Sequence, residues 1–310
     1  MTTRSRRSLL RTAIQTAAGL SLGGFGARVL LAQRLAPTAS AELGADFHVL
    51  KAGEINVLAV KTGDGLALVD GGAAADSAKL LEAAAALARG AKIETLFNTH
   101  WHPEQTGSNE ALAKAGATIV AHENTRLWLG EDVTWPWNNE MVRRLPERAR
   151  PNKSFYTDLQ LTLGGKRVSC GHLRDCPHTD GDMYVLFRDD NVLAVGDAVY
   201  GVGWPSIDWW TGGWIGGLVG GIEALLAVAN ADTRVVPARG PVLGYKDLRR
   251  QYEMYGTIWE RLVKKLYGGG GPDEAVAAKP TQEFDDIMGP SEEFVRRAFQ
   301  SLWAYLSPDA

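Results

Sequence analysis

The sequence predicts an α/β protein in which two β-sheets are sandwiched between helices. Short apolar runs with strand character alternate along the chain with Ala- and Leu-rich helical segments, which is typical of sheets covered by helices. The chain of 310 residues is 45% hydrophobic and 22% charged, as expected for a globular protein with a sizeable core. The sequence contains no repeat array and no low-complexity segment.

The first half of the pattern begins at residue 47. Apolar and β-branched residues predict three short strands, over 47–51, 55–61 and 66–69. Asp70-Gly71-Gly72 is expected to end the third strand in a turn, and a helix is expected from Asp76 to about residue 89. Beyond it the pattern predicts a strand, a short helix, a strand and a helix, over 93–97, 110–114, 117–121 and 123–129.

The second half opens with a segment of little periodicity, 128–156, which contains Trp128, Trp135 and Trp137 and is expected to be a loop insertion beside the functional site. Gly164-Gly165 predicts a hairpin between strands 159–163 and 166–171. Two further strands are expected over 183–187 and 191–195, and the last strand over 233–236. Helices are expected over 216–229, 244–267 and 292–306, the second of them ended by the glycines at 268–271.

The N-terminal 41 residues have the features of an export signal. The run Ser5-Arg6-Arg7-Ser8-Leu9-Leu10 resembles the twin-arginine motif, a Gly- and Ala-rich apolar stretch follows over 12–32, and Ala39-Ser40-Ala41 fits a cleavage site. We expect a signal peptide over 1–41 and a mature domain over 42–310, soluble in the periplasm and without a stable membrane anchor after cleavage. An uncleaved anchoring helix is the alternative, which the glycines and Arg28 disfavour.

Charge excludes one class of partner. The signal segment holds six arginines and no acidic residue, which leaves 27 basic residues against 36 acidic ones and a charge of −9 for the mature domain. Nucleic-acid binding usually requires a basic face, so no nucleic-acid partner is expected. A small-molecule substrate is the expected partner.

A pair of histidines, His100 and His102, follows the predicted strand 93–97. Two histidines two residues apart on extended backbone point to the same side, so both rings can reach one metal ion. Zn²⁺ prefers such nitrogen ligands. A third histidine, His178, lies in the run Cys176-Pro177-His178-Thr179-Asp180-Gly181-Asp182 ahead of strand 183–187, and Asp197 follows strand 191–195.

These motifs together resemble the metallo-β-lactamase superfamily of metal-dependent hydrolases, from about residue 46 to about residue 245. The resemblance implies a four-layer αββα sandwich with the metal at one edge. It also implies that His100, His102 and His178 bind a first zinc, and that Asp197 lies near the metal. The remaining histidines, His48, His122 and His172, are expected to be structural.

The sequence departs from the family pattern at three positions, all in the second metal site. Glu104 stands where the family has an aspartate, Gln105 where it has a histidine, and Arg239 where it has the last histidine. A single zinc is therefore expected, and a second one held by Glu104, Asp197 and water stays possible. We hypothesise that Arg239 replaces the missing ion and pairs with Asp197 or Glu104; the alternative is a surface arginine on a turn between two prolines.

The function implied is that of an exported zinc-dependent hydrolase, in which zinc-bound hydroxide attacks an ester, lactone, amide or thioester carbonyl. Asp197 or Glu104 would manage the proton, and the sequence does not choose between them. Trp204, Trp209 and Trp210 are expected either in a substrate wall or in the core. The alternative function is a non-catalytic zinc- or ligand-binding periplasmic protein of the same fold.

Two cysteines, Cys170 and Cys176, flank the segment that leads to His178. In an oxidising compartment they could form a disulfide that stiffens this loop. A buried Cys170 with a free Cys176 is the alternative that we favour.

Overall fold

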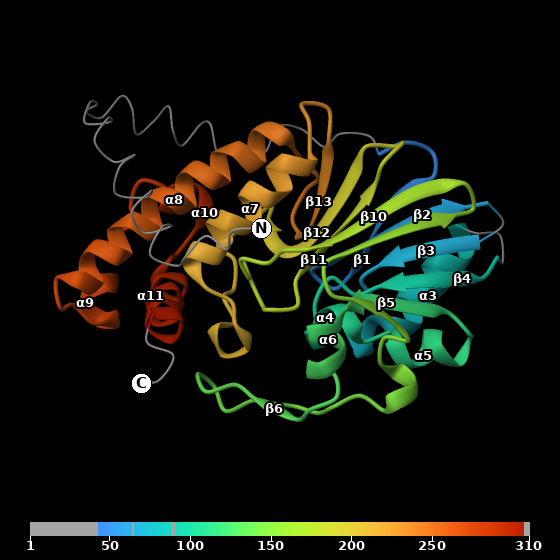
Figure 1. Cartoon of the computed structure of the whole chain (residues 1–310), viewed down its shortest axis with the longest axis horizontal. Coiled ribbons are helices and arrows are strands. Elements are labelled where there is room, and N and C mark those ends of the chain that lie inside the picture. The colour runs from blue at the N-terminus through green and yellow to red at the C-terminus, as the bar shows by residue number, and fades with distance from the viewer. Residues whose placement is uncertain (1–42, 64, 88–90, 307–310) are drawn as a thin grey trace.

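The computed structural model describes residues 43–63, 65–87 and 91–306 (Figure 1). The predicted signal peptide, with its twin-arginine motif and its cleavage site, lies outside these residues. In the part of the chain that is described, no helix combines the length and the apolar character that a membrane span requires.

The first sheet has six strands in the order β1-β2-β3-β4-β5-β8. Its members are β1 (Phe47–Ala52), β2 (Ile55–Thr62), β3 (Gly65–Val69), β4 (Ile93–Phe97), β5 (Thr118–His122) and β8 (Lys153–Phe155). The first three strands are antiparallel, and β3, β4, β5 and β8 run parallel to one another. All five residues of β3 are buried, as expected for a strand covered on both faces.

The second sheet also has six strands, in the order β14-β13-β12-β11-β10-β9. Its members are β9 (Asp158–Leu163), β10 (Lys166–His172), β11 (Met183–Phe187), β12 (Val192–Tyr200), β13 (Arg234–Arg239) and β14 (Leu243–Gly244). Only β12 and β13 pair in parallel. The β9–β10 hairpin turns at Gly164 and Gly165, whose φ angles of 51° and 89° favour glycine.

Helices cover the outer face of each sheet, which gives the four layers of an αββα sandwich (Figure 1). On the first sheet lie α3 (Ser77–Leu87) and α5 (Asn109–Lys114), with the short α4 (Pro103–Thr106) and α6 (Glu123–Trp128) at its end. On the second sheet lie α7 (Ile215–Val228) and α8 (Tyr245–Tyr267). The short α9 (Pro272–Ala277) and α10 (Asp285–Met288) connect α8 to α11 (Glu292–Leu306), which packs against α7 and α8.

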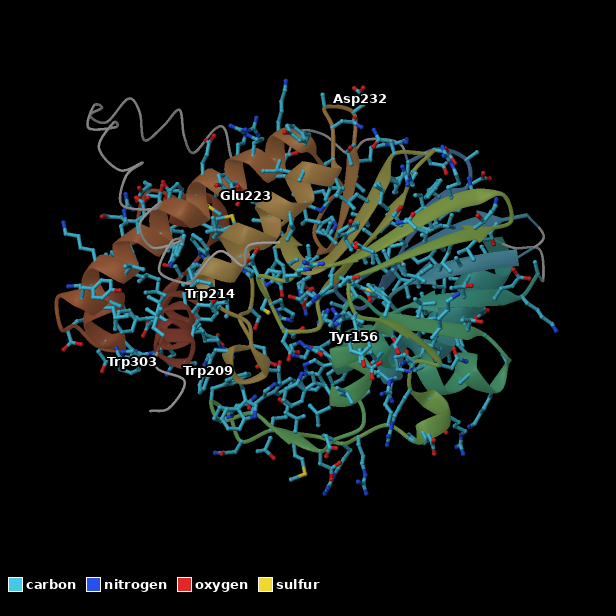
Figure 2. All side chains as sticks on the ribbon, in the orientation of Figure 1. Tyr156, Trp209, Trp214, Glu223, Asp232 and Trp303 are labelled. Carbon is cyan, nitrogen blue, oxygen red and sulfur yellow. The ribbon has the colours of Figure 1, made fainter. Side chains whose placement is uncertain are left out.

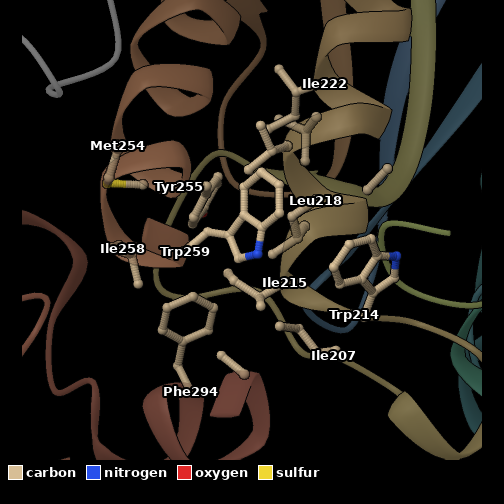
Figure 3. Packing of buried hydrophobic residues seen from close by; sticks show 14 of the residues in the cluster. Ile207, Trp214, Ile215, Leu218, Ile222, Met254, Tyr255, Ile258, Trp259 and Phe294 are labelled. Atoms are coloured by element: carbon tan, nitrogen blue, oxygen red, sulfur yellow. The ribbon is translucent and has the colours of Figure 1, made fainter. Parts of the chain in front are cut away.

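Apolar side chains fill the spaces between the layers. Between the sheets, the rings of Phe47 and Phe187 pack edge to face, with their centroids 5.3 Å apart. Outside the second sheet, Trp259 of α8 and Phe294 of α11 pack against the apolar face of α7 (Figure 3). Full burial of each such large apolar side chain contributes roughly 1.5–3 kcal/mol, so the C-terminal helices are an integral layer of the fold.

The segment 128–156 is more ordered than the sequence analysis predicts. It contains the small hairpin β6 (Val133–Thr134) and β7 (Met141–Val142), which lies at the lower rim of the molecule in Figure 1, and then β8. The expectation of a plain loop was wrong here because β8 is only three residues long and is stabilised by its parallel pairing with β5, a long-range contact without local periodicity.

Two strands extend further than predicted, and this changes where site residues lie. β12 continues past Val195 to Tyr200, so Asp197 lies within the strand, next to register irregularities at Gly196. β13 continues to Arg239, which is therefore the final residue of a strand and does not belong to the turn. The prediction that this strand is the last one was also wrong, because β14 follows it.

Candidate metal centre

Three buried histidines meet at one end of the sandwich. His100 and His102 lie in the loop that leaves the carboxyl end of β4, and His178 lies in the loop that enters β11. One ring nitrogen of each histidine lies within 4.8 Å of the other two. The backbone N–H of Met183 donates to the Thr99 carbonyl oxygen at 2.9 Å and so holds the two loops together.

The outer hydrogen-bond partners of His102 and His178 decide which nitrogen of each ring faces the centre. His102 Nε2 lies 2.8 Å from Asp208 Oδ2 and donates its proton to this carboxylate. His178 Nδ1 donates to the Ser206 carbonyl oxygen at 2.7 Å. His102 Nδ1 and His178 Nε2 are thus the two nitrogens that face the centre, and they lie 2.9 Å apart. Two imidazole nitrogens held this close to each other can bind the same cation.

His100 is prepared in a similar way. Its Nδ1 lies 3.2 Å from Thr99 Oγ1, and that hydroxyl lies 3.0 and 2.9 Å from the two carboxyl oxygens of Asp70. His100 Nε2 is buried and makes no hydrogen bond with any described residue. Burial lowers the pKa of His100 well below its ordinary value of 6.5, and the nearby His178 and His102 rings lower it further. The ring is therefore neutral, the form that binds a metal.

Two acidic side chains lie beside these nitrogens. Asp197 Oδ2 lies 3.9 Å from His100 Nε2 and 3.7 Å from His178 Nε2. The Tyr200 hydroxyl donates to the same oxygen at 3.2 Å. Asp197 Oδ1 and Glu104 Oε2 are buried, and neither has a hydrogen-bond partner among the described residues. A carboxylate so placed can serve as a further ligand or can accept a proton from water.

Asp208 positions His102. Its Oδ2 accepts a hydrogen bond from Trp135 Nε1 at 3.1 Å as well as that from His102, and its Oδ1 accepts from the backbone N–H of Thr211 at 3.1 Å. Burial raises the pKa of this carboxyl, but the bonds from His102 and Thr211 outweigh burial and hold the pKa below its ordinary value. Asp208 is therefore ionised, and it fixes both the tautomer and the orientation of the ring.

The loop that carries Asp208 approaches the His178 loop closely. Asp208 N–H donates to the His178 carbonyl oxygen at 3.1 Å, and Gly213 N–H donates to the Asp208 carbonyl oxygen at 2.8 Å. A Cβ atom at Gly213 would lie only 2.0 Å from the His178 carbonyl oxygen. Only glycine therefore permits this approach, which brings Asp208 within reach of His102.

A cavity of about 550 Å³ opens in front of the histidines. His102, His178, Asp197 and Glu104 line one side of it. Its other walls include aromatic side chains from three separate segments, namely Trp135, Trp137, Tyr200, Trp204 and Phe294. The size and the mixed lining suit a small organic molecule.

The three tryptophans proposed for the substrate wall lie in different places. Trp204 lines the cavity, where it stacks on Phe294 with ring centroids 4.7 Å apart. Trp209 (labelled in Figure 2) and Trp210 are not among the residues that line the described cavity. Trp209 is half-buried and packs against the core outside the second sheet, whereas the side chain of Trp210 is 52% exposed.

Comparison with known proteins agrees with this arrangement. The family model described as the metallo-beta-lactamase superfamily matches residues 50–266. The chain belongs to this superfamily. It is similar to a metallo-beta-lactamase from Pontibacter korlensis, with 18% sequence identity and a TM-score of 0.52, over 67% of this chain and 98% of that one. That likeness concerns the fold alone, and no curated protein matches the chain.

The metallo-β-lactamase fold and the family resemblance are thus confirmed. The superfamily is usually hydrolytic. The three histidines could hold a metal ion, as the resemblance implies for the first metal site of the family. Gln105 and Arg239, which stand at two ligand positions of the family's second metal site, lie in different surroundings: Gln105 is buried and Arg239 lines the cavity.

Gln105 is fully buried on α4, and neither its Oε1 nor its Nε2 has a hydrogen-bond partner among the described residues. Arg239 lines the cavity, and its guanidinium carbon lies 5.8 Å from the centre of the Tyr200 ring. The ion pairs of the described residues include none between Arg239 and Asp197 or Glu104. Burial lowers the pKa of Arg239, but Tyr200 and the charges of Asp197 and Glu104 outweigh burial and raise it.

Several residues that the structure brings to the centre carry no clear signal in the sequence. Asp208 and Ser206 anchor the outer nitrogens of two histidines, and Asp70 anchors the third through Thr99. Trp135 contacts both Asp208 and the His102 ring, with ring centroids 5.3 Å apart. The one sequence feature that could have pointed to Asp208 is its position next to Trp209 and Trp210. The sequence around Asp70 predicts only a turn.

The remaining cysteines and histidines lie outside the centre. Cys170 is buried and Cys176 is half-buried, and both are free thiols. The rings of His122 and His172 stack on each other with centroids 3.7 Å apart. His172 Nε2 donates to the Asp180 carbonyl oxygen at 3.0 Å and thereby supports the loop that carries His178.

Proposed function

We propose that this protein is a zinc-dependent hydrolase that cleaves an ester, lactone, amide or thioester bond. The observation that carries the proposal is the buried cluster of His100, His102 and His178, whose ring nitrogens lie within 4.8 Å of one another. Hydrogen bonds to Asp208 and Ser206 orient the His102 and His178 rings towards the centre of this cluster. A buried arrangement of this kind is stabilised by a bound cation, and three imidazole donors match the preference of Zn²⁺.

When bound, the metal would polarise the substrate carbonyl and lower the pKa of water at the site. The chain itself supplies the rest. Asp197 faces the same space as the three histidines, so we assign it the role of proton acceptor from the attacking water. Tyr200 holds Asp197 Oδ2 in place through its hydroxyl. The aromatic walls exclude bulk water from one side of the cavity, which strengthens the electrostatic interactions inside it.

We further propose that a single metal suffices. Gln105 is a poor zinc ligand, and a guanidinium at Arg239 cannot act as a ligand at all. Two of the three positions that hold the second metal in the family are therefore lost. The positive charge of Arg239 in the same cavity also opposes a second cation there.

The test is a panel of esters, thioesters, lactones, amides and β-lactams, assayed with zinc-loaded protein and again after removal of the metal by a chelator. Turnover that the chelator abolishes and zinc restores supports the proposal. Asp197→Asn should lower the rate by about 100-fold or more while zinc stays bound, and Glu104→Gln is the parallel variant. If Glu104→Gln alone abolishes turnover, the proton acceptor is Glu104.

The alternative is a zinc- or ligand-binding protein that has lost turnover. The orphaned amide of Gln105 favours it, because that side chain replaces a family ligand without gaining a partner among the described residues. Full zinc binding with no turnover of any compound in the panel would support this alternative.

We also propose export to the periplasm through the twin-arginine route, on the evidence of the motif around Arg6 and Arg7. Replacing both arginines by lysine should leave the precursor inside the cell. Sequencing of the mature N-terminus should begin at Glu42. Normal periplasmic accumulation of the double variant would refute the route.

A further inference from the structure

Arg239 occupies a defined place in the wall of the cavity. It is the last residue of β13 and pairs in register with Tyr200 of β12. Its carbonyl oxygen accepts a hydrogen bond from the Gly201 N–H at 2.8 Å, which fixes the backbone at this position. The guanidinium then lies beside the Tyr200 ring, in the wall of the cavity that Asp197 and Glu104 also line.

Among the described residues, no acidic side chain that lines the cavity forms an ion pair with Arg239. Asp208 is bound to His102 and Trp135, and Asp197 accepts from Tyr200 and faces the histidines. Glu104 Oε2 makes no hydrogen bond with a described residue and forms no ion pair with Arg239. A guanidinium carries five N–H donors in a planar fork, so Arg239 keeps donors for an anion that enters the cavity.

Arg297 provides a comparison within the same cavity. Its guanidinium donates to Glu293 at 2.6 Å and to Ser206 Oγ at 3.3 Å, and it lies 4.5 Å above the Trp137 ring. These contacts engage Arg297 as a structural link between α11 and the β6–β7 hairpin. Arg239 also lines the cavity, but its side-chain contacts are fewer. It lies over the Tyr200 ring, donates a hydrogen bond to the Tyr200 side chain, and forms no ion pair with a described residue.

We propose that Arg239 binds a carboxylate of the substrate, so that the site takes carbonyl compounds bearing a second, anionic group next to a planar or apolar body. This inference rests on the proposed function, because it assigns the substrate class of the same site. The fork of Arg239 pairs with the carboxylate, and the aromatic side chains of Trp204 and Phe294 contact the apolar part.

Metal binding should strengthen this anion site. Without a metal, the negative charges of Asp197 and Glu104 repel an incoming carboxylate. The same charges attract Arg239. A divalent cation on the histidines offsets those charges, so the cavity becomes more favourable for an anion. The affinity for a substrate-like anion should therefore increase when zinc is loaded.

Two aromatic acids test the proposal without requiring turnover. Benzoate has one carboxylate, which can reach the zinc, whereas isophthalate has a second carboxylate on the same ring for Arg239. Calorimetric titration of the zinc-loaded protein should give a dissociation constant for isophthalate about 10- to 100-fold lower than for benzoate, the range of one charge-assisted bidentate pair.

Arg239→Gln should reduce that preference to about twofold or less while its zinc content and its melting temperature stay near those of the wild type. Arg239→Lys should retain part of the preference, because it keeps the charge and loses the fork. The matched control is Arg297→Gln, which removes a cation from the same cavity and should keep the preference.

Equal binding of the two acids by the wild-type protein would overturn the inference, and so would an undiminished preference in Arg239→Gln. Because the measurement is one of binding, it stands apart from the hydrolysis assay. A preference for isophthalate in a protein without turnover would leave the anion site intact and reject only the proposed enzyme activity.

Discussion

The Nε2–H of His102 donates to Asp208 Oδ2 at 2.8 Å, and the same oxygen accepts from Trp135 Nε1 at 3.1 Å. A single buried carboxylate therefore links one ring of the histidine cluster to the β6–β7 hairpin that borders the cavity. The two partners come from segments that are more than seventy residues distant from Asp208 along the chain. The contact predicts the behaviour of a variant at this position.

Asp208→Asn should weaken zinc binding by about 10- to 100-fold with the fold retained, because a neutral amide orients and polarises the His102 ring less strongly. Competition with a chromogenic chelator measures the affinity. Trp135→Phe, which removes one donor and leaves the His102 bond, should have a smaller effect, and the exposed Asp232→Asn (Figure 2) should have none. Wild-type zinc affinity in Asp208→Asn would show that the carboxylate does not position the ring.

Close to one zinc per chain should be bound after purification without added metal, as measured by elemental analysis. His178→Ala should lose this zinc, because His100 and His102 alone rarely hold the ion. The matched control is His48→Ala, which removes a histidine on β1 that lies outside the ligand cluster. Two tightly held metals in the wild type, or full occupancy in His178→Ala, would contradict the assignment.

Protonation of His172 should destabilise the folded protein in mild acid. Burial lowers the pKa of this residue from its ordinary 6.5 to about 4, and the stacked His122 ring lowers it further. The unfolded chain therefore takes up a proton at higher pH than the folded one, and stability falls as pH decreases from about 6.5 towards 4. Because His172 is partly exposed, its protonation should lower the free energy of unfolding by only roughly 1–3 kcal/mol.

Unfolding in urea at several pH values measures this effect. His172→Gln keeps a donor for the Asp180 carbonyl oxygen and should remove this part of the acid sensitivity. Burial raises the pKa of Asp180 and of Asp182 to about 6, which acts in the opposite direction, so the difference between variant and wild type is the informative quantity. Identical pH profiles for the two proteins would contradict the assignment.

Both cysteines should be titratable as thiols. Denaturation without reductant followed by reaction with a chromogenic disulfide reagent should yield two thiols per chain, since Cys170 and Cys176 are both free. In the native protein both should react slowly, because burial raises the pKa of each thiol to about 12. Recovery of no thiols from the purified protein would show that the two cysteines form a disulfide.

The fold class, and the three histidines that could hold a metal ion, were predictable from the amino-acid sequence. The reason is that these features depend on local patterns. β11 is a continuous apolar run, β4 ends in the apolar pair Leu96 and Phe97, and α11 has a clear helical period, so the bounds of these elements could be predicted closely. The spacing of His100 and His102 and the motif around His178 are likewise local.

The groups that surround those histidines became apparent from the three-dimensional fold, and local sequence patterns do not show them. Asp208 and Trp135 reach His102 through loops whose conformation depends on long-range contacts, and no local pattern shows that they meet. The same holds for Arg239, where the sequence showed the replacement of a ligand but not the direction of the side chain. Its contact with Tyr200, in place of an ion pair with a carboxylate, follows from the parallel register of β12 and β13, which pairing between distant segments sets.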